Sequence, residues 1–158
     1  WKAREHGFAT RFIELAGEVN TAIPRFVVEK TAWGLNDHGK SIRGARILIL
    51  GVAYKKDVDD TRESPAMEIM RLLQEKGAVL SYHDPFVPEL YAMRHYDFSN
   101  LSSVELTEDL LKSQDAVVIA TDHTKIDYQQ IVDHAQLVID TRNATRDVEK
   151  GQEKIVRA

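Results

Sequence analysis

The sequence predicts an α/β protein: a three-layer, Rossmann-like domain with a mainly parallel sheet, preceded by a long connecting helix. Short apolar runs alternate with amphipathic segments through most of the chain, as expected for helices packed on both faces of a parallel sheet. An amphipathic stretch of helical period fills residues 10–36, ahead of the first apolar run. We therefore expect a helical segment over residues 1–44 and an α/β domain over residues 45–158.

The first segment is predicted to be a helix from about Thr10 to Asn36. Its apolar residues recur at spacings of three and four, as on one face of a helix. Pro24 interrupts the pattern, so we expect a kink or a break near residues 21–23. A continuous helix would be roughly 40 Å long at about 1.5 Å per residue, more than a compact domain of this size needs. That length indicates a connector or a subunit interface, and two ordinary helices packed on the sheet are the alternative.

The α/β part is divided by residues that start and stop helices. Ser64 is a good N-cap, Pro65 suits the first helical position and Gly77 is a stop signal. Thr107 and Asp127 are expected to cap two shorter helices. The expected elements, in chain order, are strand 46–51, loop 52–63, helix 64–76, strand 78–83, an irregular stretch 85–103, a brief strand 104–106, helix 107–112, strand 115–121, helix 127–134, strand 137–140 and a charged tail from residue 145 that ends in a short strand or frays.

The composition excludes several classes of function. A net charge of -4 argues against a broad nucleic-acid surface. The absence of cysteine removes disulfides, thiolate metal sites and a Cys nucleophile, and it fits a cytoplasmic location. The histidines lack metal-ligand spacing, so no metal site is expected, and no apolar run approaches the about 20 residues of a membrane span. Because the chain begins at Trp1 rather than Met, we expect it to be part of a longer protein.

Basic side chains near strand ends predict a site for an anionic ligand. In an α/β sheet, ligands bind beyond the carboxyl ends of the strands. The loop after the first strand supplies Tyr54, Lys55, Lys56 and Arg62, and Arg142 follows the last main strand. Arginine binds phosphate by two parallel hydrogen bonds and lysine supplies a point charge, so this group suits a diphosphate.

The loop lacks the glycine fingerprint of a dinucleotide site, because Gly51 stands alone where three glycines are needed. Side chains rather than the backbone must then bind the anion. The alternative is a solvated loop with internal ion pairs, such as Lys56 with Asp59 or Arg62 with Asp60, which contribute little energy.

Three polar residues near strand ends are expected to have ordinary structural roles. Asp84 follows the second strand, where a ribose-binding acid lies in dinucleotide folds, but without the glycines it is expected to begin a turn with Pro85. His83 and His123 are isolated in the sequence and are expected to be surface or packing residues.

The segment from Gly51 to Pro65, Gly-Val-Ala-Tyr-Lys-Lys-Asp-Val-Asp-Asp-Thr-Arg-Glu-Ser-Pro, resembles the signature loop of a known family. That family is the UDP-glucose/GDP-mannose dehydrogenases, and the loop lies in their C-terminal, UDP-binding domain. Residues 83–85 and 140–143 are similar to the family as well, as are residues 1–5 and 11–20 of the leading segment. The resemblance covers essentially the whole chain and is greatest to bacterial enzymes that oxidise UDP-N-acetylhexosamines to uronic acids.

The resemblance implies the substrate-binding part of an NAD-dependent oxidoreductase. The family's complete enzyme has an N-terminal NAD-binding domain, a central helix used in dimerisation and this C-terminal domain. It oxidises the sugar C6 alcohol to a carboxylate, reduces two NAD and holds an intermediate on a cysteine. By this resemblance, Tyr54, Lys55 and Arg142 contact the nucleotide sugar and Arg62 reaches NAD across the domain interface, whereas Lys56 receives no role. No catalytic residue is expected in this chain, since it lacks the family's glycine fingerprint and cysteine.

The resemblance also implies a UDP-sugar as ligand, NAD bound mainly by a missing N-terminal domain, and a homodimer joined through helix 10–36. Its products would feed polysaccharide synthesis. Two other functions stay open. One is a non-catalytic nucleotide-binding or regulatory module with a flavodoxin-like fold, and the other is a dimerisation piece dominated by residues 1–36. UDP binding that weakens on Lys55→Ala or Arg142→Ala would distinguish the dehydrogenase function from both of these alternatives.

Overall fold

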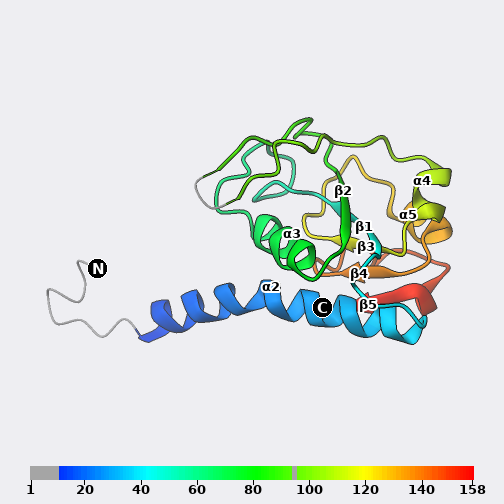
Figure 1. The fold of residues 1–158 in the computed structure, drawn as a ribbon, viewed down its shortest axis with the longest axis horizontal. Helices are drawn as coiled ribbons and strands as arrows, with labels where there is room; N and C mark the ends of the chain where they lie inside the picture. Colours follow the sequence, from blue (N-terminus) through cyan, green and yellow to red (C-terminus); the bar gives the residue numbers. More distant parts are fainter. Residues whose placement is uncertain (1–10, 94–95) are drawn as a thin grey trace, which may run out of the picture.

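The computed structural model describes residues 11–93 and 96–158, which form a five-stranded sheet covered by helices on both faces (Figure 1). The strands are β1 (Arg46–Leu50), β2 (Val79–His83), β3 (Ala116–Ile119), β4 (Val138–Asp140) and β5 (Ile155–Arg157). The helices are α2 (Arg11–Asp37), α3 (Pro65–Glu75), α4 (Glu108–Ser113) and α5 (Tyr128–His134), with a 3-10 turn at Gln152–Lys154. All neighbouring strands are parallel, in the order β2-β1-β3-β4-β5. The predicted three-layer α/β fold is confirmed.

Alternate residues of β1 supply the two layers of core. Ile47 and Ile49 pack on the face covered by α2 and α3, whereas Leu48 and Leu50 pack on the face covered by α4 and α5. All four side chains are fully buried. Burying one such side chain stabilises the fold by about 1.5–3 kcal/mol. Because both faces are covered, the strand is apolar at every one of these positions rather than alternating.

Helix α2 runs through Pro24 as one continuous helix. The break expected near residues 21–23 is therefore wrong, and so is the alternative of two separate helices. Proline has no N–H group, so the carbonyl of Asn20 loses its partner one turn later. Asn20 lies on an exposed stretch of the helix, where water can bind that carbonyl. The Pro24 ring itself is buried and begins the face that packs on the domain.

The two halves of α2 have different environments. Val28 and Leu35 in the second half are buried in the core beside α3 and the sheet. In the first half Phe12 is 89% exposed, and Figure 1 shows these blue turns extending beyond α3. No helix among the described residues has the length and apolar character needed to cross a membrane. The division between residues 44 and 45 stays a prediction, and residues 1–10, with the expected helix start, lie outside the described residues.

The predicted helix boundaries are confirmed by their caps. The Ser64 hydroxyl accepts a hydrogen bond from the Ala66 N–H at 3.3 Å, and Pro65 is the first residue of α3. Thr107 and Asp127 accept equivalent bonds at the starts of α4 and α5. These caps set where each helix begins, and thereby where the preceding loop must end.

The brief strand predicted over residues 104–106 is wrong. Val104 bonds to the edge strand through its N–H, at the carbonyl of Tyr82, and through its carbonyl, at the His83 ring. Ser103 forms a single bridge with the same Tyr82. The chain then leaves the sheet to reach the α4 cap at Thr107. The residues between Val104 and Thr107 are too few to pair with β2 as a strand.

Candidate functional site at the carboxyl ends of the strands

The order in which the chain adds strands reverses between β1 and β3. From β1 the chain adds β2 on one side, and it then adds β3, β4 and β5 on the other. The order β2-β1-β3-β4-β5 is the flavodoxin-like order, in which ligands bind at the carboxyl ends of the strands beside this switch point. Two loops flank it: residues 51–57 after β1, here called the β1 loop, and residues 120–124 after β3, here called the β3 loop. The turn at 141–145 follows the adjacent strand β4.

Gly51 allows the two flanking loops to come into contact. Its φ is +76°, and a Cβ at this position would lie 2.2 Å from the carbonyl oxygen of Thr121. The Thr121 hydroxyl donates to the carbonyl of Ala53 at 2.6 Å, which ties the loops together. Glycine is therefore needed here because two backbones approach closely, and this need is independent of any ligand.

Tyr54 and Lys55 extend from the β1 loop. Tyr54 is 48% exposed, and the Lys55 ammonium lies 5.5 Å from the centre of its ring. A cation–π contact at an exposed site contributes about 0.5–1 kcal/mol, too little to hold the lysine in place. The two side chains expected to contact the nucleotide sugar thus lie side by side, with an accessible charge and an accessible aromatic face.

One carboxylate, that of Asp122, brings Lys56 and Arg142 together. Lys56 Nζ lies 3.8 Å from one carboxylate oxygen, and Arg142 Nε donates to the other at 3.2 Å. Lys56 thus pairs with a residue of the β3 loop rather than with Asp59. Both cations are about half exposed, and exposed ion pairs contribute only about 0–1 kcal/mol. A bound phosphate can therefore replace Asp122 at little cost.

Arg62 is paired separately from this group. Its Nε and one terminal nitrogen donate to the two carboxylate oxygens of Asp60, at 3.0 and 2.9 Å. These bonds lower the pKa of Asp60 to about 2. Arg62 remains 85% exposed, so the internal pair considered from the sequence is present and leaves the guanidinium accessible. The expected contact of Arg62 with NAD stays a prediction.

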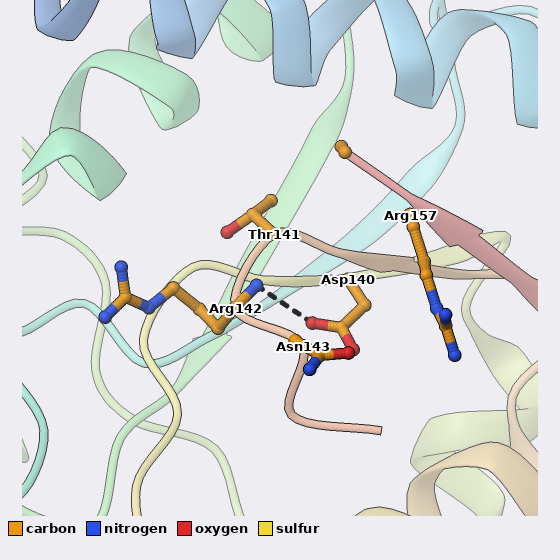
Figure 2. Close-up of a pocket in the computed structure, with 6 residues that line it drawn as sticks. Asp140, Thr141, Arg142, Asn143 and Arg157 are labelled. Carbon is orange, nitrogen blue, oxygen red and sulfur yellow. Dashed lines mark hydrogen bonds between the residues drawn. The ribbon is translucent and has the colours of Figure 1, made fainter. Parts of the chain in front are cut away.

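Asp140, the last residue of β4, shapes the turn that carries Arg142 (Figure 2). One carboxylate oxygen accepts the N–H groups of Arg142 and Ala144, at 2.9 and 3.1 Å. The other accepts the N–H and hydroxyl of Thr145, at 2.8 and 2.6 Å. Burial alone would raise the pKa of Asp140, but these four hydrogen bonds outweigh it and lower the pKa. The carboxylate therefore stays ionised and holds the turn, in which Asn143 has a φ of +55°.

A hollow of about 440 Å³ opens beside this turn and is lined by Asp140, Thr141, Arg142, Asn143, Arg157 and Ala158. Figure 2 shows the side chains of Arg142 and Arg157 extending to opposite sides of Asp140. Arg157 was not predicted, because it belongs to a three-residue strand within a charged tail, which has no periodic signal. Its place in the site depends on the pairing of β5 with β4, which sets Arg157 opposite Asp140.

A buried pair beneath the β1 loop was also missed. His123 is fully buried, and its Nε2 lies 3.0 Å from the Asp84 carboxylate. Asp84 begins the predicted turn by accepting the N–H of Phe86 at 2.8 Å, and it also accepts the N–H of Val52. Burial would raise the pKa of Asp84, but the hydrogen bonds from His123 and the backbone lower it overall. Among the described residues, no three His, Asp or Glu side chains are grouped to hold a metal.

The family model for the UDP-glucose/GDP-mannose dehydrogenase family, UDP binding domain, matches residues 48–147. The chain belongs to the UDP-glucose/GDP-mannose dehydrogenase family. The matched UDP binding domain runs from β1 past β4, so it includes the β1 loop, the β3 loop and the turn with Arg142. The family predicted from the loop motif is confirmed.

Relatives in this family have similar sequences and folds. The chain is 31% identical over 151 residues to UDP-N-acetyl-D-mannosamine dehydrogenase of Methanococcus maripaludis, with 90% of this chain and 33% of that protein covered. It is 32% identical over 143 residues to UDP-glucose 6-dehydrogenase of Rickettsia conorii, with 87% and 32% covered. The structure of a UDP-glucose dehydrogenase from Pyrobaculum islandicum superposes with a TM-score of 0.71 at 27% identity, with 98% and 33% covered. The chain thus spans about a third of the length of the relatives it matches.

Proposed function

We propose that the chain is the C-terminal, nucleotide-sugar-binding part of a cytoplasmic, NAD-dependent UDP-sugar 6-dehydrogenase. The observation that carries this proposal is the match to the UDP binding domain across the loops of the switch point. The substrate is a UDP-sugar, with a UDP-N-acetylhexosamine as the first candidate, and the product is the uronate used for polysaccharide synthesis. NAD is bound mainly by an N-terminal domain and the catalytic residues lie in segments outside this chain, which covers about a third of its relatives.

In this proposal the chain's own residues anchor the nucleotide end of the substrate. Lys55 and Arg142 neutralise the diphosphate, for which Arg142 exchanges Asp122 for a phosphate oxygen. Tyr54 offers its ring to the nucleotide sugar. Arg62 is accessible for a contact with NAD across the domain interface. Binding energy remote from the sugar C6 atom then positions that atom at the reaction centre.

Lys55→Ala and Arg142→Ala are each expected to weaken UDP binding by about tenfold or more. A hydrogen bond to a charged group contributes about 1.5–3 kcal/mol, which corresponds to at least that factor. Calorimetry with UDP measures the effect. Lys112→Ala is the control, because Lys112 pairs with Glu108 on α4, which leads into the amino end of β3. Unchanged affinity in both variants would contradict the assignment, and binding of another nucleotide with UDP silent would favour the regulatory module.

The complete enzyme tests the reaction itself. NADH formation is scored with UDP-N-acetylglucosamine, UDP-glucose and GDP-mannose. The proposal expects turnover with a UDP-sugar and loss of activity when Lys55 or Arg142 is replaced by alanine. Turnover with GDP-mannose alone would overturn the choice of substrate class.

We further infer that α2 joins two copies of the chain in a homodimer. The helix has a second apolar stripe at helical spacing, separate from the face that packs on its own sheet. These residues are between 42% and 89% exposed: Phe12, Leu15, Val19, Ile23, Phe26 and Trp33. A helix with two apolar faces needs two partners, and exposed apolar stripes of this kind mark interaction sites. The sheet covers the first face, and the same stripe of a second copy suits the other.

Leu15→Glu together with Phe26→Glu is expected to convert the dimer to a monomer, because a buried interface does not tolerate unpaired charges. Sedimentation or light scattering gives the mass. Glu18→Lys is the control, because Glu18 is an exposed residue of the same helix half that does not belong to the apolar stripe. Point substitutions are preferred to removal of residues 1–36, since that removal would take Val28 and Leu35 from the core. A wild-type chain that is monomeric at micromolar concentration would refute the dimer.

A further inference from the structure

The β1 loop is fixed at both ends by one buried pair of side chains. At its start, the Asp84 carboxylate accepts the N–H groups of Val52 and Ala53, at 2.8 and 3.1 Å. At its end, Nδ1 of His123 accepts the N–H of Asp57 at 3.0 Å. Asp84 and His123 are joined to each other at 3.0 Å, and both side chains are 0% exposed. The loop is therefore held by a continuous chain of hydrogen bonds that starts and finishes at its own backbone.

The direction of these bonds determines where the proton of His123 lies. The backbone N–H of Asp57 can only donate, so Nδ1 must be an unprotonated acceptor. The proton of the neutral ring is then on Nε2, which donates to Asp84. A doubly protonated ring would place two donors against each other at Asp57. Only one tautomer holds both ends of the loop.

The loop between these contacts needs such support. Asp57 has a φ of +59°, which residues other than glycine rarely adopt. Its carboxylate accepts the N–H and hydroxyl of Thr124, at 2.9 and 2.8 Å, so the β3 loop holds this residue a second time. Tyr54 and Lys55 lie within the span that is held in this way. Their positions thus depend on contacts made by buried residues of neighbouring strand ends.

We propose that Asp84 and His123 are positioning residues, which hold the β1 loop in the shape that binds the nucleotide sugar. The inference rests on the proposed function, because the ligand of this loop is itself proposed. Both side chains are fully buried, so they act through the backbone of the loop and leave contact with the ligand to Tyr54 and Lys55. A loop that is already ordered loses less conformational freedom on binding, and binding is tighter for that reason.

Two matched variants separate the two halves of the clamp. In His123→Gln the side-chain amide reaches the place of Nε2, so it keeps the donor to Asp84 and loses the acceptor for Asp57. In His123→Asn the amide oxygen takes the place of Nδ1, so it keeps the acceptor for Asp57. The Gln variant is expected to show about tenfold faster hydrogen exchange at the Asp57 amide and about tenfold weaker UDP binding. The Asn variant, which keeps the acceptor for Asp57 but loses the donor to Asp84, is expected to give values between those of the wild type and the Gln variant.

Leu35→Ala is the control for a general loss of stability. Leu35 is buried, and its carbonyl accepts the N–H of Lys40, whose side chain bonds to Asp115 just before β3. It thus lies near the amino ends of the strands, at the opposite edge of the sheet from the β1 loop. The cavity should lower the melting temperature without changing exchange in the loop or UDP affinity. Exchange and affinity in His123→Gln that change no more than in Leu35→Ala would overturn the positioning role.

The wild-type ring offers a test that requires no variant. Nitrogen NMR of His123 is expected to show Nδ1 unprotonated and Nε2 protonated at neutral pH. The opposite tautomer or a doubly protonated ring would overturn the proposal. A wild-type chain that binds no UDP would count against a UDP site that this chain forms by itself, whereas the exchange rates and the tautomer would still support or overturn the positioning role.

Discussion

Gly51→Ala is expected to destabilise the domain by about 3 kcal/mol or more, the largest effect predicted for a single methyl group in this chain. A left-handed φ costs a non-glycine residue about 1–2 kcal/mol, and Gly51 has a φ of +76°. The added Cβ would also lie 2.2 Å from the carbonyl oxygen of Thr121 and 2.7 Å from its Cβ. Forcing an extra group into a packed site costs a further 1–3 kcal/mol or so. Urea unfolding measures the loss.

Gly39→Ala separates the two contributions. Gly39 also has a positive φ, of +67°, but no heavy atom lies within 4 Å of the place where a Cβ would be. Gly39→Ala should lose only the free energy that a left-handed φ costs a non-glycine residue. The difference in stability loss between the two variants therefore measures the contact between the β1 and β3 loops. Equal losses would mean that these two strand ends do not approach as closely as described.

Asp140→Asn is expected to have the second largest effect, about 2–3 kcal/mol at neutral pH. Each buried donor left unpaired costs about 1–3 kcal/mol. The amide can replace one carboxylate oxygen, but its NH₂ group then faces the N–H and hydroxyl donors of Thr145, which is fully buried. Thermal unfolding measures the loss of stability. Because this turn carries Arg142, the variant should also bind UDP more weakly. Asp147→Asn is the control, since that side chain is 86% exposed and should change stability little.

The same variant changes how stability depends on pH. The pKa of Asp140 in the folded state is below its ordinary value of 3.8, so unfolding takes up a proton at acidic pH. Its contribution is therefore complete above the ordinary value and is lost as the pH falls through the lower, folded value. The wild type should lose more stability than Asp140→Asn between pH 5 and about pH 2. The variant should keep some pH dependence, because the pKa of Asp84 is lowered too. Identical pH profiles would contradict the role of Asp140 in the turn.

Local signals in the sequence were sufficient for much of the fold. Ser64 and Asp127 are caps whose side chains bond to the backbone two or three residues away, so a short window contains the whole interaction. Residues 47–50 are apolar on both faces of the strand, which is enough to predict a covered parallel strand. Pro24 was misjudged because the cost of a missing hydrogen bond depends on whether water reaches the orphaned carbonyl, and exposure is a tertiary property.

The site was less accessible to prediction, for a physical reason. Lys55 and Arg142 could be selected as candidates because a charge at a strand end is visible in the sequence. Partners such as Asp122 are not, since they depend on which loops the sheet order brings together. His123 was assigned an ordinary role because its actual role depends on two hydrogen bonds to residues distant in the sequence. Asp57 is 66 positions away and Asp84 is 39 positions away.

Asp122 has a consequence for what this site can select. By lying against both Lys56 and Arg142, it occupies their charges before any ligand arrives. In the proposed function, binding of a phosphate to Arg142 is therefore an exchange of one anion for another, at the small cost of breaking an exposed ion pair, about 0–1 kcal/mol. A diphosphate exceeds a single carboxylate in charge and in the number of acceptor oxygens, whereas chloride, acetate or a lone carboxylate does not. Asp122 thus balances Lys56 and Arg142 in the free chain, and in the proposed function it gives way to a ligand that offers more charge and more acceptor oxygens.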